Sequence, residues 1–255
     1  MRDEEEERLL EEESADLIKD SSALMEAAKR KNLGLVAVYI DAGADPHAVL
    51  TWALTKENKP DIIKTLVKAG IDVNIRNERD QTVLMTVAAN QPFPDMFKAL
   101  IHAGADVGAK DKNGNTALMI AAEHNNQTLV DLLIGSQADV NDQDQTGGTA
   151  LTRAVLNNNQ GIVKSLIKAG ADISLRDNNG RTAFTEALQA DNPAVGIIFC
   201  LIEAGADVKT KDAAGKLPFD YIIGKIKSKK DYLKLKELML GSIGKPIHKK
   251  RFLKK

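Results

Sequence analysis

The chain is poor in cysteine and aromatic residues and has no long apolar run. Its single cysteine, Cys200, cannot form a disulfide within the chain and suits a reducing compartment. Aromatic residues make up only 4% of the sequence, so aliphatic and alanine side chains must build the core. No stretch reaches the roughly 18 apolar residues of a membrane-spanning helix, and the first residues lack the apolar core of a secretory signal. We therefore expect a cytoplasmic protein, although a chain trimmed to its mature form would look the same.

The sequence also lacks a pattern that points to catalysis or metal binding. It contains no glycine-rich phosphate-binding motif. Cys200 is flanked by apolar residues such as Phe199 and Leu201, which favours a buried core thiol over a nucleophile. The four histidines lie in different parts of the chain, with no second ligand at helical spacing: His47, His102, His124 and His248. We expect no enzyme activity, no metal and no cofactor.

A Gly-Ala-Asp triplet recurs along the chain at a nearly fixed period. Clear copies begin at Gly43, Gly104, Gly170 and Gly205, and weaker copies at Gly70 and Gln137, so that successive spacings are 27, 34, 33, 33 and 35 residues. A period in this range indicates stacked supersecondary units, each too small to bury its apolar face alone.

The fourth unit shows what each repeat is expected to build. Asp111-Lys112-Asn113-Gly114 has the composition of a turn, and Thr116 can cap a short helix whose buried side carries small apolar residues. The chain reverses at Asn125-Asn126, and residues 129–134 supply a second apolar helix. The sequence predicts an all-α repeat solenoid of stacked antiparallel helix pairs with short β-turn or hairpin fingers.

These units resemble the ankyrin repeat. The opening half of that motif is matched at 113–118, 147–151 and 179–184, and its closing half at 105–107, 138–141 and 206–208. The resemblance covers about residues 22–223 and implies six repeats followed by a degenerate C-terminal capping repeat. The histidine of the family's motif is replaced here by Met25, Thr51, Met85, Met119, Thr152, Thr185 and Asp220. We expect each unit with methionine to lack one hydrogen bond, worth about 1 kcal/mol.

The second unit is shorter than the others. Seven residues separate Gly43 from Leu50, whereas 14 separate Gly104 from the equivalent Leu118. The difference matches the length of a finger, so we predict no finger between the first two units, and a binding surface that starts at Arg76.

The two ends of the chain carry opposite charge. Residues 1–20 have a net charge of −7 and residues 225–255 a net charge of +10. We divide the chain into an acidic N-terminal helix or cap at 1–20, the solenoid at 21–223, a capping helix at 224–240 and a basic tail at 241–255. The acidic segment could instead be an arm for a basic partner, or disordered. The tail could be a solvated extension, or could bind nucleic acid, an anionic membrane or an acidic protein.

The family resemblance implies a binding surface on the finger tips and on the exposed edge of each first helix. Its bases outnumber its acids, which favours an acidic protein partner, although polar tips are common in any solenoid. The candidate residues are Arg76, Glu78, Arg79, Lys110, Lys112, Asn113, Glu123, His124, Gln143, Gln145, Arg176, Asn178, Arg181 and Lys211.

The sequence is compatible with two functions. The first is a monomeric, non-catalytic scaffold that binds a protein along the concave finger and inner-helix surface. The alternative is a scaffold tethered to nucleic acid or an anionic membrane through the basic tail. We expect no nucleic-acid or membrane contact elsewhere in the chain.

Overall fold

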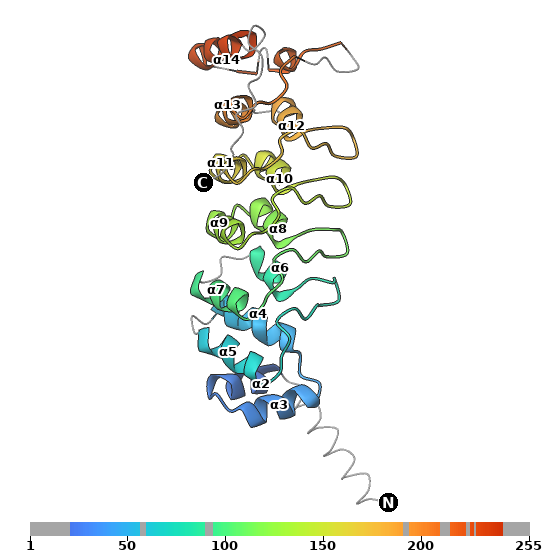
Figure 1. Ribbon diagram of the computed structural model, residues 1–255, viewed down its shortest axis with the longest axis vertical. Helices are drawn as coiled ribbons and strands as arrows, with labels where there is room; N and C mark the ends of the chain where they lie inside the picture. The colour runs from blue at the N-terminus through green and yellow to red at the C-terminus, as the bar shows by residue number, and fades with distance from the viewer. Residues whose placement is uncertain are drawn as a thin grey trace, which may run out of the picture. The chain divides into compact units, whose positions relative to one another are not determined.

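The computed structural model describes residues 21–56, 60–89, 94–190, 194–209, 215–222, 225–226 and 228–241. The chain divides into two units, residues 1–138 and 139–255, each built from helix pairs (Figure 1). The predicted N-terminal cap at 1–20, nearly all of the basic tail at 241–255, and Lys211 lie outside the described residues.

Unit 1 contains two rows of short helices. Helices α2, α4, α6 and α8 follow one another in an inner row, and α3, α5 and α7 contact one another in turn behind it, while α9 packs on α8. Small and aliphatic side chains fill the space between the rows, as the low aromatic content requires. Their bounds are α2 Ser21–Lys29, α3 Leu33–Asp41, α4 Pro46–Lys56, α5 Pro60–Lys68, α6 Val83–Ala88, α7 Pro94–His102, α8 Ala117–Glu123 and α9 Gln127–Gly135.

Unit 2 repeats the same arrangement. Helix α10 packs on α11 and α12, and α13 packs on α11, α12 and α14. The bounds are α10 Ala150–Leu156, α11 Gln160–Lys168, α12 Ala183–Gln189, α13 Val195–Glu203, a 3-10 turn η1 Pro218–Tyr221, and α14 Lys229–Gly241. Helix α14 buries Leu235 and Met239. The Lys225 ammonium donates to the carbonyl oxygens of Leu188, Gln189 and Ala190 at 3.4, 3.1 and 3.1 Å, which stabilises the C-terminal end of α12.

The inner helices α6, α8, α10 and α12 begin at threonine caps, as predicted for Thr116. The Thr116 hydroxyl accepts the Met119 N–H of α8 at 3.3 Å. In α10 the exchange is reciprocal, because the Thr152 hydroxyl also accepts the Thr149 N–H at 2.8 Å. Helix α12 has the same reciprocal pair, whereas a methionine occupies this position in α6 and α8. For Met85 and Met119 this confirms the absence of the bond that Thr152 and Thr185 make.

Each finger turns around one side-chain carboxylate or amide. The Asp111 carboxylate accepts the N–H groups of Asn113 and Asn115 at 2.9 and 2.8 Å. Equivalent turns form around Asn77, Asp144 and Asp177, at spacings of 34, 33 and 33 residues. Asp and Asn favour such turns because their side chains bond the backbone two residues on. The turn residues therefore fix the shape of every described finger.

Helix α4 begins at Pro46, directly after the turn that ends α3, so the first two units have no finger between them, as predicted.

The expectation of a buried Cys200 is wrong in degree. Its thiol is only half-buried and accepts the Gln160 side-chain N–H at 3.6 Å, because this side of α13 faces the start of α11.

The folded structure lowers the pKa of one histidine and three finger aspartates. Burial lowers the pKa of His47 below its ordinary value of 6.5, against the attraction of Asp45. Burial opposes the ionisation of Asp111, Asp144 and Asp177, but hydrogen bonds to their carboxylates outweigh it, and each pKa lies below its ordinary value of 3.8.

We expect stability to fall in two steps as the pH decreases. At all four sites the unfolded chain binds the proton more tightly than the folded chain, so the free energy of unfolding decreases on acidification. The contribution of His47 is complete above pH 6.5 and is lost below it, and that of the aspartates is lost below about pH 4. Urea unfolding from pH 8 to pH 3 would measure this. A His47→Gln variant should keep only the acid step; an unchanged profile in that variant would contradict the assignment.

Candidate partner-binding surface

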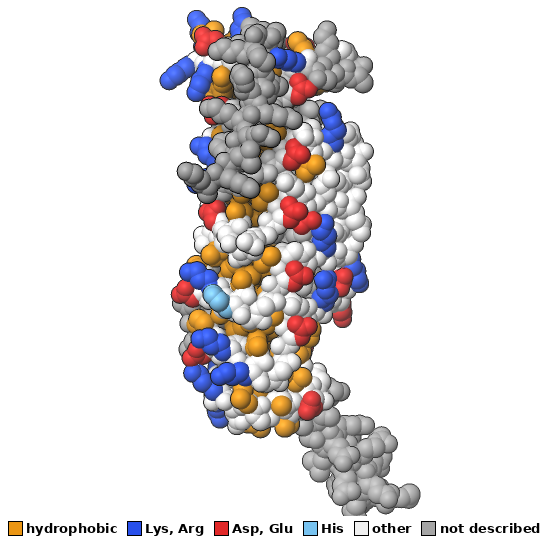
Figure 2. Space-filling view, viewed as in Figure 1, with side chains coloured by type: hydrophobic (Ala, Val, Ile, Leu, Met, Phe, Trp, Pro, Cys, Tyr) orange, Lys and Arg blue, Asp and Glu red, His pale blue; other side chains and the backbone are white. Residues whose placement is uncertain are grey.

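The candidate surface consists of the fingers and the adjacent ends of the inner helices. The fingers extend from the inner row in each unit (Figure 1), and in unit 1 Lys and Arg side chains gather at this edge beside Asp and Glu (Figure 2). In unit 1 the structure brings together the candidates on two adjacent fingers, Arg76, Glu78, Arg79, Lys110, Lys112 and Asn113. In unit 2 it does the same for Gln143, Gln145, Arg176, Asn178 and Arg181.

Several candidate residues form hydrogen bonds from one finger to the next, which we call ties. The Arg76 guanidinium donates to the Asp80 carbonyl of its own finger at 2.8 Å and to the Lys110 carbonyl of the next at 2.7 Å. In unit 2 the Gln143 amide does the same, donating to Gly147 at 2.8 Å and Arg176 at 3.0 Å. Two different side chains thus perform one structural task at the same position of the repeat.

A second set of hydrogen bonds, at the finger tips, runs from each finger to the preceding one. The Lys112 ammonium donates to the Glu78 carbonyl of the preceding finger at 2.7 Å. In unit 2 the Asn178 side chain donates to the Gln145 carbonyl at 2.9 Å, and the Asn178 backbone N–H donates to Thr146 at 2.8 Å. These ties hold the tips in register, so part of the basic character of the surface has a structural reason.

The remaining cations differ in how far their charge is compensated. Arg181 contacts the carboxylates of Asp177 and Glu186 at 2.8 and 2.9 Å, so its charge is balanced locally. Arg176 donates to the Gly180 carbonyl at 2.7 Å, and no carboxylate contacts it among the described residues. Arg79 is exposed, and its side chain has no polar partner in the described part of the chain.

Two candidates lie away from the finger tips. Glu123 and His124 are exposed at the C-terminal end of α8, where the His124 ring contacts the Ile120 carbonyl through Nδ1 at 3.0 Å. The corresponding end of α10 exposes Leu156, whose relative exposure is 63%. An exposed leucine on an inner helix is the kind of apolar contact that a partner can cover.

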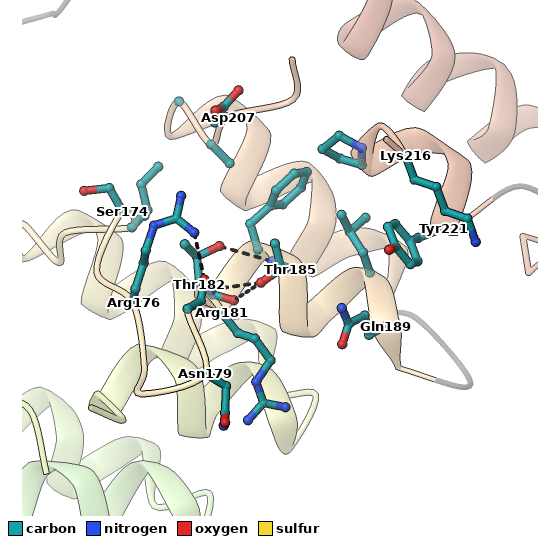
Figure 3. Close-up of a pocket in the computed structure, with 17 residues that line it drawn as sticks. Ser174, Arg176, Asn179, Arg181, Thr182, Thr185, Gln189, Asp207, Lys216 and Tyr221 are labelled. Carbon is teal, nitrogen blue, oxygen red and sulfur yellow. Dashed lines mark hydrogen bonds between the residues drawn. The ribbon is translucent and has the colours of Figure 1, made fainter. Parts of the chain in front are cut away.

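Unit 2 also contains a cavity that the sequence did not predict. Its volume is about 530 Å³, and it lies between the finger that turns around Asp177, α12 and η1 (Figure 3). Lys216, Pro218 and Tyr221 form one side. These residues belong to the degenerate seventh unit, which departs from the repeat pattern and so gives no periodic signal for them.

Within the described ranges, no three His, Cys, Asp or Glu side chains are grouped so as to hold a metal ion. No helix of the described part is long and apolar enough to span a bilayer.

Comparison with known proteins agrees with the repeat architecture. The family model for ankyrin repeats matches residues 24–110, 50–144, 84–177 and 126–212. The ankyrin repeat domain of Bcl-3, described as a unique member of the IkappaB protein family, superposes with a TM-score of 0.67 at 23% sequence identity, over 84% of this chain and 97% of that one. A search of curated proteins found no sequence that matches this chain. Because the family model matches well over half of its residues, the chain belongs to the ankyrin repeat family.

Proposed function

We propose that this chain is a monomeric, non-catalytic binding module whose fingers and inner-helix ends contact a protein partner with an acidic surface. Ankyrin repeat domains generally mediate protein–protein interactions and are typically non-catalytic. The finer assignment to the finger cations goes beyond family membership and has its own support.

One observation carries the proposal. Each unit presents on its fingers an exposed arginine that no carboxylate contacts among the described residues, Arg79 in unit 1 and Arg176 in unit 2. Lys112 lies on the same fingers as Arg79, where its ammonium donates to the Glu78 carbonyl at 2.7 Å. Uncompensated charge on a rigid surface raises the rate of encounter with an oppositely charged partner and makes binding sensitive to salt.

The chain itself supplies substitutions that remove charge while keeping the fingers intact. Positions 79, 110 and 112 of unit 1 correspond in the repeat to Asn179, Gln143 and Asn178 of unit 2. At two of them the neutral residue makes the inter-finger bond, with Gln143 donating to the Arg176 carbonyl and Asn178 to the Gln145 carbonyl. The variant Arg79→Asn, Lys110→Gln, Lys112→Asn therefore removes three charges with little cost in stability.

Affinity capture from a lysate of the source cells, with mass spectrometry, tests the proposal. We expect the intact chain to retain a partner that this finger variant loses, with at least a roughly tenfold drop in recovery, since charged hydrogen bonds are worth about 1.5–3 kcal/mol each. The control variant carries Lys64→Gln, Lys68→Gln and Lys98→Gln on the outer helices α5 and α7, and should retain the partner. Equal capture by the finger variant and the intact chain would refute the proposal.

A further inference from the structure

The cavity of unit 2 is lined by cationic, hydrogen-bonding and apolar side chains. In Figure 3, Arg176 lies on one side and Lys216 on the other, with Thr185 of α12 between them. Tyr221 and Gln189 lie near Lys216. Its volume of about 530 Å³ is within the range of roughly 300–1,000 Å³ that is common for ligand sites.

Among the described residues that line the cavity, positive charge exceeds negative charge. Three are cations, Arg176, Arg181 and Lys216, and one is an acid, Asp207. One of the three, Arg181, is compensated by Asp177 and Glu186, as described above. Arg176 donates to a neutral carbonyl, and the Lys216 ammonium lies over the Tyr221 ring at 5.4 Å from its centre. Asp207 accepts the Lys209 backbone N–H at 2.8 Å. The described part of the lining therefore carries more positive than negative formal charge.

The remaining walls are apolar or capable of hydrogen bonding. Ile173 and Tyr221 are half-buried, and Pro218 is buried, so they offer apolar surface rather than solvated groups. The exposed Gln189 amide adds an NH2 donor group and a carbonyl acceptor. This mixture matches a peptide, which carries backbone amides and apolar side chains as well as charge, better than it matches a small inorganic anion.

From this geometry we infer that the cavity binds an extended acidic segment of a protein partner, with carboxylates directed at Arg176 and Lys216 and the chain crossing α12 at Thr185. The inference rests on the proposed function and specifies the chemistry of the partner. Arginine favours a carboxylate here because its planar guanidinium can donate two parallel hydrogen bonds. The Tyr221 ring provides the apolar surface beside the second charge.

A conservative variant can test the cavity without damaging the finger. Arg176 Nη1 donates to the Gly180 carbonyl at 2.7 Å, and the equivalent bond one repeat earlier is made by the Gln143 amide to Gly147 at 2.8 Å. Arg176→Gln should therefore preserve the turn while removing the charge. We combine it with Lys216→Gln. The matched control is Lys164→Gln with Lys168→Gln, which removes two exposed charges from α11 in the same unit.

The experiment selects peptides from a random octapeptide library on the intact chain and measures the affinity of the enriched, fluorescently labelled peptides by anisotropy. We expect enrichment of Asp and Glu, a loss of affinity of about tenfold or more in the Arg176→Gln, Lys216→Gln variant, and less than about twofold in the control. Selected peptides without acidic residues, or acidic peptides whose affinity is the same in both variants, would overturn the inference.

The capture experiment on the fingers and the peptide experiment on the cavity can give a negative result independently of each other. The finger variant changes only unit 1 and leaves every residue of the cavity in place. If the partner is lost from the finger variant but no acidic peptide depends on Arg176 and Lys216, the proposed function stands and the cavity assignment falls. If the finger variant retains its partner, the proposed function fails whatever the peptides show.

Discussion

Replacing Gly147 with alanine is expected to destabilise the protein by about 3 kcal/mol, whereas Gly180→Ala should cost only about 1 kcal/mol. The two glycines occupy the same position in successive fingers and have nearly the same backbone conformation, with φ of +79° and +76°. Both substitutions therefore carry the same cost of placing a side chain at positive φ.

The difference lies in the space around each glycine. A Cβ on Gly147 would lie 2.8 Å from the Asp177 Cα of the next finger, a backbone atom that cannot move aside without shifting that finger. A Cβ on Gly180 would meet nothing within 4 Å. The close approach at Gly147 follows from the Asn178 N–H bond to Thr146, which draws the two fingers together. Urea unfolding followed by circular dichroism compares the two variants, and equal losses would show that the fingers are not packed this closely.

The second large effect is expected at Asp144. Its carboxylate accepts the N–H groups of Thr146 and Gly148 at 2.7 and 2.9 Å and pairs with the Arg153 guanidinium at 2.8 Å. The side chains of Asp144 and Arg153 are only 7% and 19% exposed. Asp144→Ala therefore leaves a largely buried guanidinium without this partner and two finger N–H groups without their acceptor. We expect a loss of about 3 kcal/mol.

Asp177→Ala is the matched comparison one repeat later. It removes the same turn bonds, but its partner Arg181 is 42% exposed and keeps its contact with Glu186 at 2.9 Å. We expect a loss of about 1–2 kcal/mol. Thermal and urea unfolding of the two variants measure the difference. A larger loss from Asp177→Ala than from Asp144→Ala would contradict the account of the buried pair.

The repeat architecture was predictable because each element depends on local residues. Thr116 caps α8 and Asn125 adopts positive φ, at 56°, at the reversal between helices, as their residue types suggested. The missing finger after Gly43 followed from counting residues alone. These features need no knowledge of the neighbouring repeat.

The roles of the surface cations were less predictable because they depend on contacts between repeats. Arg76 and Gln143 perform the same tie with different chemistry, so neither composition nor charge distinguishes a structural cation from an available one. The cavity was missed for a related reason. Tyr221 and Pro218 belong to a degenerate unit, and their placement beside the finger that turns around Asp177 follows from packing rather than from the repeat pattern.

The most direct test of the central claim is the salt dependence of affinity for the captured partner, measured for the intact chain, the finger variant and the outer-helix control. If the finger cations contact an acidic partner, the intact chain and the control should share one steep dependence, and the finger variant should bind more weakly with a flatter one. Identical slopes and affinities for all three proteins would place recognition elsewhere on the molecule and contradict the account.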